Sequence, residues 1–238
     1  TTEIYTLSLH DALPIWRVWG FLLHAVRRRY SCAFLPSLRF IGEQQLAHQL
    51  QYKDSTVGGL SGIDYDVDTD TCILLSDERS RHNAARFYTA TLDYDETSFN
   101  RVILNDVVYF IQQNQASSPE QANEIVDLED IRFDPPDGSI WYVSEGDRRL
   151  GLNPFIRQAT RQGEFISELA LHLMFSMYTD CELGPRDNLS FEGLRFSQIK
   201  QSLWVAMEGS LFQDGEVPTP TAKTMLQNKI AMASESSE

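Results

Sequence analysis

The chain has 238 residues and a formal net charge of −14, with 34 Asp and Glu residues against 20 Lys and Arg. The acidic excess lies after residue 40, where 32 acidic and 15 basic residues leave a net charge of −17. A surface of this sign repels nucleic acid and anionic membranes and suits a protein that binds cations, so we expect no nucleic-acid partner.

The first 37 residues are predicted to lie outside the fold. Residues 1–15 can be written back, codon by codon, as a common sequencing-library adapter, which marks them as an artefact of sequence assembly. Residues 16–37 form a doubtful leader. Its apolar run, Val18–Val26, is too short to span a membrane, and its arginine cluster, Arg27–Arg29, follows the run, whereas a secretory signal carries its charges before it. We therefore expect no membrane insertion.

Three later segments align with one another: Leu60–Glu78, Leu128–Gly146 and Phe191–Gly209. Each contains a short β-type run, then a polar turn, then a second apolar strand that runs into an acidic residue. The three acids that end these second strands are Asp77, Glu145 and Glu208. A spacing in the tens of residues between similar strand pairs is typical of repeated β-architectures.

Further strand-like runs follow the first two segments. They are Arg86–Asp93, Arg101–Ile111, Pro154–Ala159 and Glu164–Leu171. Residues Phe165–Met177 could also read as a helix, and Asn114–Asn123 reads as a loop. This density of strands predicts an all-β protein, an incomplete β-propeller of repeated four-stranded blades that occupies residues 38–221. A β-sandwich with a coincidental internal similarity is the alternative. Residues 222–238 are predicted to form a disordered or frameshifted tail.

The alignment brings two further acids to matching places. Glu129 and Glu192 stand one residue before Asp130 and Gly193, where the first strands of the second and third segments open. If the segments superpose in space, the repeated acids gather on one face near the propeller axis. The candidate metal ligands are then Asp77, Glu129, Glu145, Glu192 and Glu208. Calcium takes six to eight oxygen ligands in flexible geometry, which suits such a ring. The alternative is that these acids only cap turns.

A set of motifs in this order resembles one protein family. The motifs are GGLSGIDYD (Gly58–Asp66), LLSDERS (Leu74–Ser80), ARFYTATLDYD (Ala85–Asp95), DLEDIRFDP (Asp127–Pro135), SEGD (Ser144–Asp147) and GPRDNLSFEGL (Gly184–Leu194). Together they resemble the phytase-like family, also described as esterase-like activity of phytase. The resemblance implies an extracytoplasmic protein that hydrolyses phosphate or carboxylic esters of small molecules. Asp130 departs from the family's usual glycine, which puts the role of the second segment in question.

The same motifs supply candidate substrate ligands. Arg79 lies in LLSDERS, and Arg186 and Asn188 lie in GPRDNLSFEGL. Because arginine grips phosphate and carboxylate through two hydrogen bonds, the resemblance implies that these residues bind the substrate. No nucleophilic triad emerges, so the catalytic residues stay unassigned. We expect a cation-assisted ester hydrolase; the alternatives are a non-catalytic binding propeller with a structural calcium site, or an inactive truncated fragment.

Overall fold

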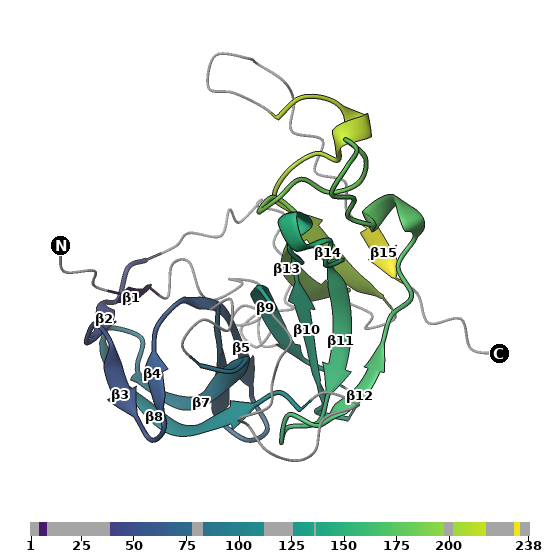
Figure 1. Cartoon of the computed structure of the whole chain (residues 1–238). Coiled ribbons are helices and arrows are strands. Elements are labelled where there is room, and N and C mark those ends of the chain that lie inside the picture. Colours follow the sequence, from purple (N-terminus) through teal and green to yellow (C-terminus); the bar gives the residue numbers. More distant parts are fainter. Residues whose placement is uncertain are drawn as a thin grey trace, which may run out of the picture.

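The computed structural model describes residues 39–77, 83–111, 126–135, 137–197 and 202–217, together with two short strands near the ends of the chain. The described residues form antiparallel β-strands joined by turns and short 3-10 helices (Figure 1). This confirms the predicted all-β class. The described strands do not close into a ring, so the propeller stays a prediction. The predicted loop Asn114–Asn123 falls outside the described residues.

Two four-stranded antiparallel sheets follow one another along the chain. The first contains β5 (Leu60–Asp66), β6 (Thr71–Ser76), β7 (Arg86–Tyr94) and β8 (Phe99–Tyr109). The second contains β9 (Leu128–Phe133), β10 (Ile140–Ser144), β11 (Phe155–Ala159) and β12 (Phe165–Glu168). In both, each strand pairs with the next one in sequence, as the predicted four-stranded units require.

The remaining strands form smaller sheets. The third sheet contains β13 (Phe191–Phe196), β14 (Leu203–Met207) and β15 (Ala231–Ala233). Near the start of the chain, β1 (Tyr5–Ser8) pairs with β2 (Glu43–Leu46), and β3 (Leu50–Tyr52) pairs with β4 (Ser55–Val57). The stretch with a possible helical reading is instead extended, forming β12 and a 3-10 turn at Leu173–Phe175.

The first strand of each of the three sheets lies on the inside of the arrangement. Strand β9 contacts β5 on one side and β13 on the other, and Figure 1 shows these three strands in succession. The three aligned sequence segments therefore begin sheets whose opening strands are neighbours in space.

Residues 140–143 of β10 are apolar without alternation because each face of the strand is covered by a neighbouring sheet. Ile140 and Tyr142 point into the core between the first two sheets, whereas Trp141 and Val143 point into the core between the second and third sheets. Side chains alternate across a strand, so a strand with a neighbouring sheet on each face needs apolar residues throughout. Full burial of each such side chain contributes about 1.5–3 kcal/mol to stability. The second sheet is thus held between its two neighbours.

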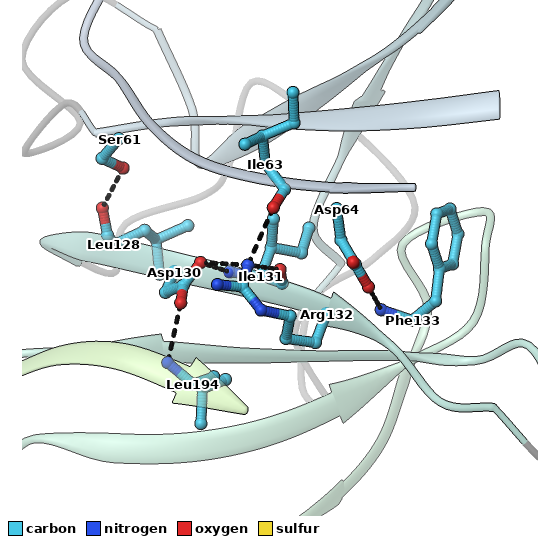
Figure 2. A network of polar contacts seen from close by, with 9 residues as sticks. All are labelled: Ser61, Ile63, Asp64, Leu128, Asp130, Ile131, Arg132, Phe133 and Leu194. Carbon is cyan, nitrogen blue, oxygen red and sulfur yellow. Dashed lines mark hydrogen bonds and ion pairs between the residues drawn. The ribbon is translucent and has the colours of Figure 1, made fainter. Parts of the chain in front are cut away.

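A buried polar network joins the inner strands (Figure 2). Asp64 of β5 accepts a hydrogen bond from the backbone N–H of Phe133 in β9, with 2.9 Å between Oδ2 and N. Asp130 of β9 accepts one from the backbone N–H of Leu194 in β13, with 2.7 Å between Oδ2 and N. These two carboxylates therefore link the three sheets through their first strands. We call Asp64, Asp130 and Arg132 the strand network.

Arg132 completes the strand network. Its Nη1 lies 2.5 Å from Oδ1 of Asp130 and donates to the backbone carbonyl of Ile63 in β5 at 2.9 Å. Burial raises the pKa of Asp130 to about 6, although the guanidinium of Arg132 and the N–H groups of Leu194 and Ile131 act in the opposite direction. Asp130, which stands where the other two segments have Gly62 and Gly193, is thus a structural crosslink between sheets.

Candidate metal centre

Each inner strand opens with an irregularity at the aligned position. In the second sheet Leu128 pairs with Ser144 and Asp130 pairs with Val143, so Glu129 is an extra residue between two regular pairs. The same shift in the third sheet makes Glu192 the extra residue, and in the first sheet it is Ser61. A β-bulge of this kind re-aims the side chain of the extra residue. Glu129 and Glu192 are the acids that the sequence alignment singled out.

In each of the three sheets, a backbone hydrogen bond joins the residue that follows the second strand to the residue that precedes the first strand. The backbone N–H groups of Asp77, Glu145 and Glu208 donate to the carbonyl oxygens of Gly59, Asp127 and Ser190, with N to O distances of 2.5, 3.0 and 2.9 Å. Each acid at the end of a second strand therefore lies beside the bulge of its own sheet. Because the three first strands are neighbours, the bulges and the strand ends meet at one edge of the inner strands.

Six carboxylates gather at this edge, which we call the acid cluster: Asp77, Asp127, Glu129, Glu145, Glu192 and Glu208. Oxygens of Asp77, Asp127 and Glu129 lie within 4.8 Å of one another, and so do oxygens of Glu129, Glu145 and Glu192. Glu208 joins through a hydrogen bond between its carboxyl group and that of Glu192. The structure thus brings together all five acids that were predicted from the sequence to be metal ligands. Their binding of a metal stays a prediction.

Asp127 is the member that the sequence did not single out. It is buried, with 5% of its surface exposed, and it shares a hydrogen bond with Glu145. Its aligned residues in the other two segments are Gly59 and Ser190, so repetition gives no signal at this position. Its place directly ahead of Leu128 and the Glu129 bulge was the available clue.

Mutual proximity changes the electrostatics of these acids. Burial raises the pKa of Glu129 to about 9, and the charges of Asp77, Glu192, Glu145 and Asp127 add to the effect. The pKa values of Glu145 and Glu192 are also raised, by burial first and then by the neighbouring carboxyl groups. Carboxylates this close repel one another, so either some hold protons or a cation neutralises them.

The composition of the acid cluster fits a hard cation. Its ligand atoms are carboxylate oxygens, the donors that calcium prefers, and six acids can supply the six to eight oxygens of a calcium shell when some bind through both oxygens. Mg²⁺ demands near-ideal octahedral geometry and keeps several waters, so a cage made wholly of protein carboxylates suits calcium better. The cluster lacks the Cys and His ligands typical of structural zinc sites.

The proposed substrate ligands occupy different places. Arg79 falls outside the described residues. Arg186 donates from Nε to the carbonyl of Ser210 at 3.2 Å and from Nη2 to that of Gly215 at 2.6 Å, and its guanidinium lies 4.1 Å from the ring centre of Phe212. These contacts tie down the loop after β14. Asn188 is exposed and has a left-handed backbone, with φ of 56°. Substrate binding by these three residues stays a prediction.

Comparison with protein families gives a match over most of the chain. The sequence profile of the phytase-like family, described as esterase-like activity of phytase, matches residues 55–234. No curated protein gives a significant match to the chain. In the part of the chain that the structure describes, no helix has the length and apolar character needed to cross a membrane.

Proposed function

Because the chain belongs to the phytase-like family, we propose that it is an ester hydrolase that binds a cation and acts on phosphate esters. The family description supports hydrolysis of an ester. The observation that carries the proposal is the acid cluster, where two sets of three carboxylates share Glu129 within metal-chelating distance. A site that crowds carboxylates to this degree is stabilised by a bound cation.

Calcium is the cation that we propose. Asp77, Asp127, Glu129, Glu145 and Glu192 would hold it. When bound, the ion would polarise a phosphoryl oxygen and lower the pKa of a coordinated water. The bulges at Glu129 and Glu192 aim these two side chains into the site, and the strand network fixes the spacing of their strands. Glu208, the exposed member of the acid cluster, is hydrogen-bonded to Glu192 on the solvent side.

We also propose that the three sheets are blades of a propeller. Their first strands lie next to one another, successive sheets pack face to face, and the aligned acids meet at one edge of the inner strands. This is the arrangement expected when inner strands surround a common axis. An extracytoplasmic location is proposed on the family resemblance alone, and cell fractionation of the source organism would test it.

Turnover tests the hydrolase proposal. We would measure phosphate release from phytate and from p-nitrophenyl phosphate by the full chain, with calcium and with EDTA. The Glu129→Gln/Glu192→Gln double variant should lose the calcium-dependent rate by about 100-fold or more, since even indirect support of a metal ligand contributes 10- to 100-fold. Glu164→Gln is the matched control, because Glu164 is exposed in the turn before β12.

Three results would be informative. Calcium-dependent turnover that is lost in the double variant and kept in the control supports the proposal. Calcium binding without turnover on these substrates, or on p-nitrophenyl acetate as a carboxylic ester, overturns the hydrolase and favours a binding protein with structural calcium. Turnover that EDTA leaves intact contradicts the role of the cation.

A further inference from the structure

Arg149 lies just beyond β10, in the 3-10 turn Arg148–Leu150. Asp147 caps this turn by accepting a hydrogen bond from the backbone N–H of Leu150. The turn therefore holds Arg149 on a fixed backbone four residues after Glu145, a member of the acid cluster. The sequence gives no reason to prefer Arg149 over the other arginines of this chain.

Two carboxylates form ion pairs with the guanidinium of Arg149. Its Nη2 lies 3.1 Å from Oδ2 of Asp147, and its Nε lies 3.4 Å from Oδ2 of Asp187. The side chain of Arg149 is nevertheless 60% exposed, whereas that of Asp147 is 7% exposed. Its Nη1 has no hydrogen-bond partner among the described residues. The guanidinium is thus pre-oriented and keeps donors that face outward.

Arg149 is near the acid cluster. Asp127 is close enough to contribute to the raised pKa of Arg149, after the larger contributions of Asp147 and Asp187. Asp127 in turn shares the 4.8 Å group with Glu129. The guanidinium of Arg149 offsets part of the negative field that the acid cluster presents to an anionic substrate.

In the described part of the chain, two buried polar atoms without a partner belong to residues that contact Arg149 or the acid cluster. Oδ1 of Asp187 and Oγ of Ser190 are buried and have no hydrogen-bond partner among the described residues. The backbone N–H of Ser190 faces Oε2 of Glu145 at 3.5 Å, so this residue borders the acid cluster. Buried polar atoms normally find a partner, and of these two the hydroxyl of Ser190 can donate a hydrogen bond to an anion.

Two other arginines, Arg148 and Arg186, donate hydrogen bonds to backbone carbonyl groups. Arg148 donates from Nη1 to the carbonyls of Leu183 and Pro185 at 2.9 and 2.7 Å. Its guanidinium stacks on Phe212, the ring that Arg186 also contacts. These two arginines stabilise the loops around the site through the backbone, whereas Arg149 makes its contacts with carboxylates and presents its remaining donors to solvent.

We infer that Arg149 is an anion-binding residue of the site, where it would hold the phosphate group of a phosphate ester beside the acid cluster. This inference rests on the proposed function and adds to it the residue that selects an anionic substrate. Arginine suits the role because its planar fork donates two parallel hydrogen bonds to phosphate.

The test separates anion binding from calcium binding. Inorganic phosphate would be titrated by calorimetry into the full chain, in dilute calcium and in EGTA, and calcium would be titrated separately. Arg149→Gln should weaken phosphate binding at least about tenfold, and Arg149→Lys should recover part of the loss because it keeps the charge. Arg101→Gln is the control, since Arg101 is a 66% exposed arginine paired with Asp93 on the outer strands of the first sheet.

Calcium affinity distinguishes this role from a structural one. In Arg149→Gln it should stay the same or rise, because a positive charge beside the acid cluster is removed. Phosphate affinity that is equal in wild type and Arg149→Gln, or absent in wild type, overturns the inference. A wild type that binds phosphate but no calcium overturns the proposed function, while the phosphate titration still decides the role of Arg149.

Discussion

The strand network and the acid cluster both contain carboxylates of the inner strands β9 and β13, Asp130 in the first and Glu129 and Glu192 in the second, yet they differ in what surrounds each carboxylate. In the strand network, both oxygens of Asp130 accept hydrogen bonds, from the backbone N–H groups of Ile131 and Leu194 and from Arg132. In the acid cluster, the groups that most affect Glu129 are other carboxylates. The carboxylate of Asp130 is balanced by donors within the protein, and we expect the crowded carboxylates of the acid cluster to be stabilised by a bound cation.

The contrast separates structural acids from candidate functional acids at adjacent positions. Asp130 and Glu129 are consecutive, but the bulge directs them differently: Asp130 lies between strands, and Glu129 joins the carboxylates at the strand ends. An aspartate at the position of Gly62 and Gly193 is therefore compatible with a place for Glu129 in the acid cluster. Substitutions in each of the two regions test this separation.

Asp130→Ala should have the largest effect on stability. It leaves the N–H of Leu194 and the guanidinium of Arg132 without their buried acceptor, and breaking a buried ion pair costs about 3–5 kcal/mol. Urea unfolding would measure the loss. Asp68→Ala is the control, because Asp68 is exposed in the turn between β5 and β6. A loss no larger than that of the control would show that the crosslink is not needed.

Gly62→Ala and Gly193→Ala form a second, smaller test of the strand network. A Cβ on Gly62 would lie 2.9 Å from Oδ1 of Asp130 and 3.1 Å from its Cα, whereas on Gly193 the nearest atoms, in Ala206 and Asp130, are 3.6 and 3.8 Å away. Overpacking of this kind costs about 1–3 kcal/mol, so Gly62→Ala should be clearly the less stable variant. Equal unfolding midpoints would contradict the close packing of β5 against Asp130.

The acid cluster should make stability depend on pH when no cation is present. Glu129 has a pKa of about 9 in the folded chain against an ordinary value of 4.5, so its contribution is fully present below pH 4.5 and is lost as pH rises through 9. After allowance for its partial exposure, we expect a loss of at least about 1 kcal/mol between pH 6 and pH 9 in EGTA.

Urea unfolding of wild type and Glu129→Gln at the two pH values would measure this effect. The variant cannot ionise at this position, so its stability should change less between pH 6 and pH 9. Calcium should abolish most of the difference in wild type by stabilising the ionised cluster. Identical pH profiles for the two proteins would show that Glu129 is not held in a crowded, partly buried site.

Much of the fold could be predicted because strands such as Ile140–Ser144 have apolar residues wherever a neighbouring sheet covers them. Glu129 and Glu192 could be singled out because they align, and the structure brings them together at equivalent bulges. Asp127 could not, since its aligned residues are Gly59 and Ser190. Aligning the segments identifies acids that occur at equivalent positions. It cannot identify an acid such as Asp127, which occurs at its position in one segment alone.

The roles that could not be predicted depend on contacts between residues far apart in the sequence. The role of Asp130 depends on the N–H of Leu194, which lies in another sheet, and on the space left by Gly62. The environment of Arg149 depends on Asp187, which reaches it from the loop before β13. Local sequence patterns contain no information on such partners, because they are set by how the sheets pack.

Calcium binding to the full chain is the most direct test of the central claim that the acid cluster is a cation site. We would titrate calcium by calorimetry into chelator-treated wild type and the Glu129→Gln/Glu192→Gln variant, and follow thermal unfolding with and without the ion. Wild type should bind saturably and gain about 2.7 kcal/mol of stability at a calcium concentration 100 times the Kd, and the variant should do neither. A wild type without calcium binding, or a variant that binds calcium as tightly as wild type, would show that the acid cluster is not a cation site.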